Sequence, residues 1–170
     1  MPPRARERYD GEALWNYALR LLAGRSMTIA EVKRKLTAKA AFEADVVETL
    51  SKLKEMRVLN DRHYADSFAT ARRDGAGFGK QRVLRELAVK QVPRTVAETA
   101  VNEAYAEVDE VDHAVSFLKR KVRPTDFSDP KHLQSAFRKL RYNGFSSNAA
   151  VKALKQFSTN ADELEDSGDD

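Results

Sequence analysis

The sequence predicts an all-α protein: an elongated array of three tandem three-helix repeats, with nine helices in all. Gly and Pro are few and lie where helices would break, and no segment shows sustained alternation of β-branched residues. A pentapeptide with Val or Ala first, Arg third and Leu fifth recurs at residues 32–36, 83–87 and 136–140. Its Leu positions lie 51 and 53 residues apart. A period of about 50 residues indicates one supersecondary unit used three times.

The first repeat covers residues 11–58. Its helices are predicted at 12–22, 28–39 and 44–56. Apolar residues at helical spacing form its inward set: Leu14, Ala18, Leu21, Leu22, Ile29, Val32, Leu36, Val46, Val47, Leu50 and Leu53. Thr28, with Glu31 three residues later, matches a capping box and predicts where the second helix begins.

The second and third repeats cover residues 59–107 and 108–157. Helices are predicted at 60–73, 80–90, 93–105, 108–121 and 147–157, with a further helix that carries Leu140. The expected N-caps are Asn60 or Asp61 for the first of these helices, and Asp129, followed by Pro130, for the helix with Leu140.

A turn follows the repeated Leu in each unit and ends in an apolar residue. We expect Phe42, Val92 and Phe145 to pack there between the middle and last helices of their repeats. Gly144 suits the left-handed conformation at the end of a helix. Two short helices joined by such a turn also describe a helix-turn-helix motif, so a DNA-binding function has to be weighed.

The charge is divided between a basic body and an acidic end. Residues 159–170 carry six acids and no base, so the net charge of +4 leaves +10 on residues 1–158. This distribution is common in proteins that work near nucleic acid. Residues 1–10 and 158–170 are too polar to pack, and we expect a mobile N-terminus and a disordered acidic tail. One hypothesis is that the tail folds back on the basic surface as a mimic of DNA.

The composition excludes several classes of function. The chain has no Cys, which rules out disulfides, thiol catalysis and Cys-ligated zinc. Met1 is followed by a charged segment without an apolar stretch that could form a signal peptide or a membrane span, so we expect a cytoplasmic protein with no membrane contact. His63, His113 and His132 lack metal-ligand spacing, and no Gly-flanked nucleophilic Ser is present. We therefore expect no enzyme, no metal and no cofactor.

The glycine-rich loop at residues 75–80 superficially resembles a phosphate-binding loop. Its spacing is too short, Gln81 stands where Ser or Thr is needed, and a helix rather than a strand precedes it. We predict instead a helix C-cap and a tight connection that lets Phe78 turn inward. The scattered acids are expected to form ordinary (i, i+4) pairs, Glu31 with Lys35 and Glu86 with Lys90.

The Arg of each pentapeptide is predicted to face outward. It lies two residues before a core Leu, about 200° away on a helix with about 100° per residue. A solvated helix face is the simpler explanation for any one of these arginines. Their recurrence at one phase favours a shared ridge of Arg34, Arg85 and Arg138 that binds phosphates or an acidic protein groove.

Several stretches resemble the bacterial RecX family of regulatory proteins. They read ALRLLA at 18–23, EVKRKL at 31–36, LNDRHYADSF at 59–68, GFGKQRVLREL at 77–87 and KLRYNGF at 139–145, with Arg72 between. The resemblance covers about residues 13–157 and is most specific at 61–87. Lys80 departs from it, because a Pro is usual there in the family.

The resemblance implies a protein that binds RecA and lies in the groove of the RecA filament on single-stranded DNA. There it would block filament extension and inhibit the ATPase, coprotease and strand-exchange activities of RecA. DNA, single-stranded or duplex, is a second expected partner. The candidate contact residues are Arg34, Arg72, Lys80, Arg82, Arg85 and Arg138.

A helix-turn-helix transcription factor is the alternative. Such a protein reads base edges with Arg, Asn or Gln near the start of a recognition helix and dimerises on half-sites. The helices in question begin mostly with Ala, Val and Thr, and no dimerisation segment is evident. We therefore expect a monomer. A helical adaptor for some other protein is a third option.

Overall fold

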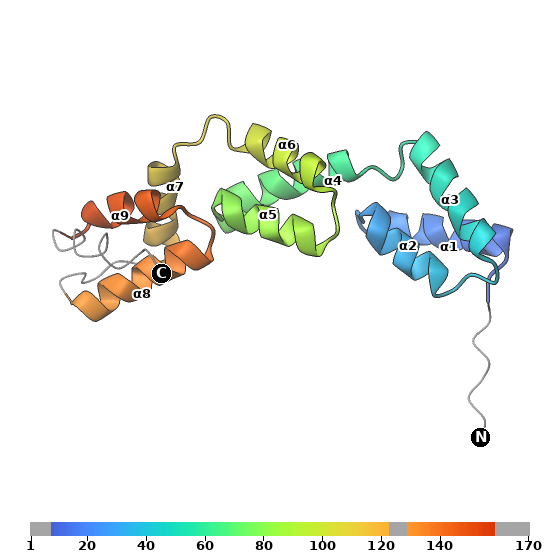
Figure 1. Cartoon of the computed structure of the whole chain (residues 1–170), viewed down its shortest axis with the longest axis horizontal. Helices are drawn as coiled ribbons and strands as arrows, with labels where there is room; N and C mark the ends of the chain where they lie inside the picture. Colours follow the sequence, from blue (N-terminus) through green and yellow to red (C-terminus); the bar gives the residue numbers. More distant parts are fainter. Residues whose placement is uncertain (1–7, 123–128, 159–170) are drawn as a thin grey trace, which may run out of the picture. The chain divides into compact units, whose positions relative to one another are not determined.

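A computed structural model of the chain describes residues 8–122 and 129–158. Within these residues it contains nine α-helices, two π-helical turns and no strand beyond an isolated bridge (Figure 1). The α-helices are α1 (Gly11–Gly24), α2 (Ile29–Thr37), α3 (Glu43–Glu55), α4 (Asp61–Ala71), α5 (Lys80–Val89), α6 (Arg94–Ala104), α7 (Glu110–Phe117), α8 (Pro130–Tyr142) and α9 (Ser147–Lys155). The π-helical turns are η1 (Arg72–Ala76) and η2 (Leu118–Val122). The predicted all-α fold class is confirmed.

The chain divides into two compact units. Unit 1 consists of Met1–Ala65 and Leu87–Ala97, and unit 2 consists of Asp66–Glu86 and Glu98–Asp170. Helices α4, α5 and α6 each contribute residues to both units. The boundaries of the three sequence repeats stay a prediction, because this division follows compactness and not repetition.

In unit 1, helices α1, α2 and α3 pack around one apolar core (Figure 1). Its buried side chains are Leu14, Ala18, Met27, Val32, Leu36, Ala40, Val46, Leu50, Leu53 and Leu59. The predicted capping box starts α2: the Thr28 side chain accepts from the Glu31 N–H, and the Glu31 carboxylate accepts from the Thr28 N–H. Asp10 caps α1 by accepting from the Ala13 N–H.

In unit 2, helices α7, α8 and α9 pack together around Phe145, which is 0% exposed. The Phe145 ring lies 5.5 Å from the rings of both Phe117 and His113. Asp129 caps α8, and Pro130 is its first residue, as predicted. The core therefore forms around the turn between α8 and α9.

The three pentapeptides occupy corresponding places in the helices α2, α5 and α8. Their Leu residues, Leu36, Leu87 and Leu140, are each 0% exposed. Their arginines are all exposed. The prediction that the Leu of each pentapeptide is buried in a core and that its Arg faces solvent is thus confirmed.

Two predictions about apolar burial in unit 1 are wrong. Phe42 is 66% exposed and sits at the N-cap of α3, although Val92 and Phe145 are buried as expected. In this turn, unlike the other two, the backbone of Tyr9 pairs with Lys39 and Ala41. Val47 is 64% exposed, since α3 buries only one face.

Positive backbone φ angles end two of the middle helices. Gly144 follows α8 with φ 95°, as its glycine predicts, whereas Gln91 follows α5 with φ 58°. Each lies four residues after the repeated Leu. The left-handed position therefore recurs in the second and third repeats, and only one of them uses glycine for it.

The predicted ends of the chain are only partly described. Residues 8–10 lie within the segment expected to be mobile, yet Tyr9 pairs with the turn after α2 and Asp10 caps α1. The predicted mobile residues 1–7 and the acidic tail 159–170 lie outside the described residues. No helix in the described part is long and apolar enough to cross a membrane.

Candidate partner-binding surface

Arg82, in the first turn of α5, contacts two aromatic rings and two polar side chains of unit 2. Its guanidinium lies 3.7 Å from the centre of the Phe78 ring and 5.3 Å from that of Tyr142. Arg82 Nε pairs with Glu86 at 3.0 Å, and Nη1 donates to Asn143 Oδ1 at 2.6 Å. These contacts fix the guanidinium plane against two aromatic faces.

Arg72 reaches the same carboxylate from the π-helical turn η1. Its Nε lies 2.8 Å from Glu86 Oε2, and both atoms are shielded from solvent. The Arg72 guanidinium also lies 4.7 Å from the centre of the Phe68 ring. One carboxylate, Glu86, thus holds two guanidinium groups, and the set keeps an excess of positive charge.

A close backbone contact supports this surface. The Gly79 N–H donates to the Asn143 carbonyl at 2.8 Å, and the Gln81 N–H donates to the Gly144 carbonyl at 3.1 Å. A Cβ at Gly79 would overlap the backbone of Gly144, so glycine is required where these chains meet. These amides are engaged within the fold, which agrees with the prediction that the loop is no phosphate cradle.

The glycine-rich loop itself is a helix end, as predicted. Gly77 adopts φ 72°, and its N–H donates to the Arg72 carbonyl. Phe78 then turns toward the core of unit 2 and is partly buried there. The loop therefore sets the position of the aromatic ring on which Arg82 lies.

Arg85 and Arg138 extend the basic surface. Arg85 Nη2 donates to the Tyr142 carbonyl at 2.9 Å. Arg138 is exposed on α8, four residues before Tyr142 and therefore one turn away on the same face. Tyr142 is 71% exposed, and its ring lies beside the Arg82 guanidinium.

The other two predicted residues, Lys80 and Arg34, make none of these contacts. Lys80 opens α5 and lines a neighbouring pocket of unit 2. Arg34 is exposed on α2 in unit 1. The structure thus brings Arg72, Arg82 and Arg85 together around α5, whereas the ridge predicted to join Arg34 to Arg85 and Arg138 stays a prediction.

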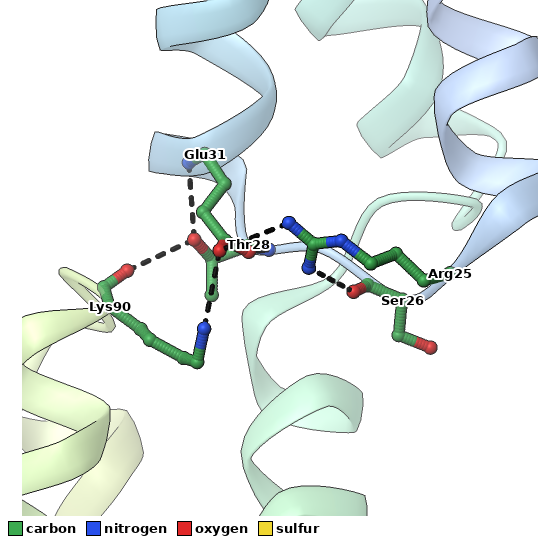
Figure 2. Close-up of polar contacts among 5 residues, drawn as sticks. All are labelled: Arg25, Ser26, Thr28, Glu31 and Lys90. Carbon is green, nitrogen blue, oxygen red and sulfur yellow. Dashed lines mark hydrogen bonds and ion pairs between the residues drawn. The ribbon is translucent and has the colours of Figure 1, made fainter.

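The start of α2 forms the polar centre of unit 1. Figure 2 shows the Glu31 carboxylate between Arg25 and Lys90, at 3.4 Å and 3.2 Å. Thr28 Oγ1 donates to the Lys90 carbonyl at 3.0 Å. Burial raises the pKa of Glu31, but the hydrogen bonds from Thr28, Lys90 and Arg25 outweigh it and leave the pKa lowered.

Asp61 joins α4 to the same helix start. Its side chain is buried and accepts from the Ile29 N–H at 2.8 Å. Burial raises the pKa of Asp61, and this hydrogen bond only partly offsets the effect. Asp61 thus caps a helix other than its own.

The two predicted (i, i+4) pairs are wrong. Glu31 pairs with Arg25 and Lys90 rather than with Lys35, and Glu86 pairs with Arg72 and Arg82 rather than with Lys90. Tertiary packing brought other cations to both acids. Sequence inspection also missed Asn143 and Tyr142, and the only signal for them was their place beside the left-handed Gly144.

The chemistry of this surface is that of binding. Within residues 8–122 and 129–158, no group of three or more His, Asp or Glu side chains is placed to hold a metal ion. The surface offers guanidinium groups and an exposed aromatic ring. Such groups recognise carboxylates, phosphates and flat rings.

Fold and surface together define a helical protein with a basic surface in unit 2. A family model described as RecX, second three-helix domain, matches residues 60–101. The chain is 31% identical over 133 residues to regulatory protein RecX of Pseudomonas putida, covering 78% of this chain and 83% of that protein. It is 29% identical over 153 residues to regulatory protein RecX of Streptomyces coelicolor, covering 89% of this chain and 78% of that protein.

The fold is also that of a solved relative. The crystal structure of RecX from Lactobacillus salivarius matches with a TM-score of 0.74 at 21% identity, covering 86% of this chain and 96% of that one. The chain belongs to the RecX family of regulatory proteins, and the resemblance seen in its sequence is confirmed.

Proposed function

We propose that this protein regulates RecA by binding RecA and its filament on single-stranded DNA. Membership of the RecX family carries the proposal. The basic surface of Arg72, Arg82 and Arg85 supports it, because the phosphates of a filament that contains DNA attract such a surface. The regulator acts by binding and not by catalysis, in the cytoplasm, as a monomer and without a cofactor.

The proposed mechanism is obstruction of the filament. Residues 11–58, 59–107 and 108–157 are proposed as three repeat units, flanked by a flexible segment at 1–10 and an acidic tail at 158–170. Contacts from several units to neighbouring RecA protomers would add through effective concentration, although each is modest. A filament held in this way extends more slowly and loses ATPase, coprotease and strand-exchange activity.

The arginines have different roles in this proposal. Arg34, Arg85 and Arg138 are the exposed contact residues. Arg72 and Arg82 are held by Glu86, so they shape and charge the surface as well as meeting the partner. DNA contact by the same surface is part of the proposal.

The test is RecA ATPase activity on single-stranded DNA, titrated with the full-length protein. We expect a dose-dependent fall in ATP hydrolysis, together with binding to preassembled filaments. No binding and no change in hydrolysis would refute the proposal. A gel shift with duplex DNA alone serves as the comparison, because sequence-specific binding without RecA would favour a transcription factor instead.

A further inference from the structure

A small pocket of about 260 Å³ lies beside the first turn of α5 in unit 2. Its wall includes Lys80 and Gln81 of α5, Tyr105 after α6, Glu110 and His113 of α7, and Ser146 before α9. Pockets for metabolites usually measure about 300–1,000 Å³. This pocket is therefore better matched to one side chain than to a free small molecule.

Most polar groups in the wall already have partners. The Tyr105 hydroxyl donates to the Phe78 carbonyl at 2.7 Å, and His113 Nε2 donates to the same oxygen at 3.0 Å. Burial raises the pKa of Tyr105, so its hydroxyl stays protonated. Because a carbonyl only accepts, His113 carries a proton on Nε2.

The acid in the wall is also engaged. Both carboxylate oxygens of Glu110 accept hydrogen bonds from Ser146, one from its N–H and one from its hydroxyl, each at 2.7 Å. Glu110 therefore serves to hold the start of α9. Its negative charge is already satisfied by hydrogen-bond donors of the protein itself.

Lys80 is the exception. The residue is half-buried and lines the pocket, and its side chain makes no hydrogen bond or ion pair with the described residues. A lysine ammonium has three donors and no acceptor. A lysine without an ion-pair partner is the group in this wall that most favours an incoming anion.

We propose that this pocket binds one Asp or Glu side chain of the protein partner through the Lys80 ammonium. The inference rests on the proposed function and adds the chemistry of one contact. A single carboxylate places one negative charge beside Lys80. A nucleic-acid backbone would also bring its neighbouring phosphates toward Glu110, which disfavours it as the occupant.

The test compares full-length variants in binding to RecA filaments assembled on single-stranded DNA. Lys80→Gln should weaken binding about tenfold, as expected for loss of a charge-assisted hydrogen bond. Lys80→Arg keeps the charge and should retain most of the affinity. Lys152→Gln, on the exposed face of α9, removes the same charge outside the pocket and should bind like the wild type.

The possible outcomes distinguish a failure of the pocket proposal from a failure of the proposed function. If the wild type and Lys80→Gln bind filaments equally well, the pocket proposal is overturned and the proposed function stands. If the wild type does not bind filaments, both are overturned. If Lys80→Gln loses as much affinity for single-stranded DNA without RecA, the occupant is nucleic acid and the proposal of a protein carboxylate is wrong.

Discussion

At Gly144 two separate effects oppose any side chain, the backbone angle and the close neighbouring backbone. Its φ of 95° disfavours any side chain, and a Cβ there would overlap the backbone of Arg82. Left-handed strain costs about 1–2 kcal/mol and overpacking about 1–3 kcal/mol. We therefore expect Gly144→Ala to lower the free energy of unfolding by about 2–5 kcal/mol, measured by urea denaturation.

Gly75 provides the matched control. It also lies in unit 2, but a Cβ there would meet nothing within 4 Å. Gly75→Ala should be close to neutral, because no left-handed strain or overlap opposes the new methyl group. Equal stability of the two variants would mean that the contact between Gly79 and Gly144 does not constrain the fold.

At the scale of a single element, the start of α2 predicts a pH dependence. The pKa of Glu31 is lowered from its ordinary 4.5, so ionised Glu31 stabilises the folded protein above that pH. This contribution is lost as the pH falls through the lower, folded-state pKa. Glu31→Gln should therefore reduce stability by about 1 kcal/mol at pH 7, because the amide can keep the cap but loses the charged hydrogen bonds, and by less below pH 4.

The measurement is chemical denaturation of both proteins between pH 3 and pH 7. Asp61 shifts in the opposite sense: burial and, to a smaller extent, the charge of Glu31 raise its pKa, so its ionisation is destabilising in both proteins and less so in Glu31→Gln. Glu48→Gln is the control, since the exposed pair of Glu48 and Lys52 should contribute little at any pH. A constant difference between wild type and Glu31→Gln across the range would contradict the prediction.

These elements also show where sequence reasoning succeeds. The capping box at Thr28 and the cap at Asp129 depend on residues three positions apart or fewer, so the sequence contains everything that decides them. The sequence does not in the same way decide which cations pair with Glu31 and Glu86. Arg82 lies four residues before Glu86 and Lys90 four residues after it, and only the packing of η1 and α8 selects the first.

For the whole molecule, periodicity predicted the helices and the burial of Leu36, Leu87 and Leu140, because each rests on local amphipathic pattern. The basic surface was predicted only as a set of arginines. Its geometry depends on Gly79 meeting Gly144, which lies 65 positions away in the chain. No spacing rule in one sequence reports such a contact.

The repeated arginines are expected to act together if they meet one partner. Arg34, Arg85 and Arg138 are exposed, and Arg85 also donates to the Tyr142 carbonyl. If all three meet the filament, each Gln variant should weaken binding by about two- to fivefold, as exposed ionic contacts do, and the triple variant by about the product. The salt dependence of binding should also become shallower.

The control is a second triple variant with the same net charge. It changes three other exposed cations to Gln, namely Arg20, Lys131 and Lys152, and it should keep nearly wild-type affinity. If both triple variants lose affinity equally, the effect is one of net charge, and no ridge exists.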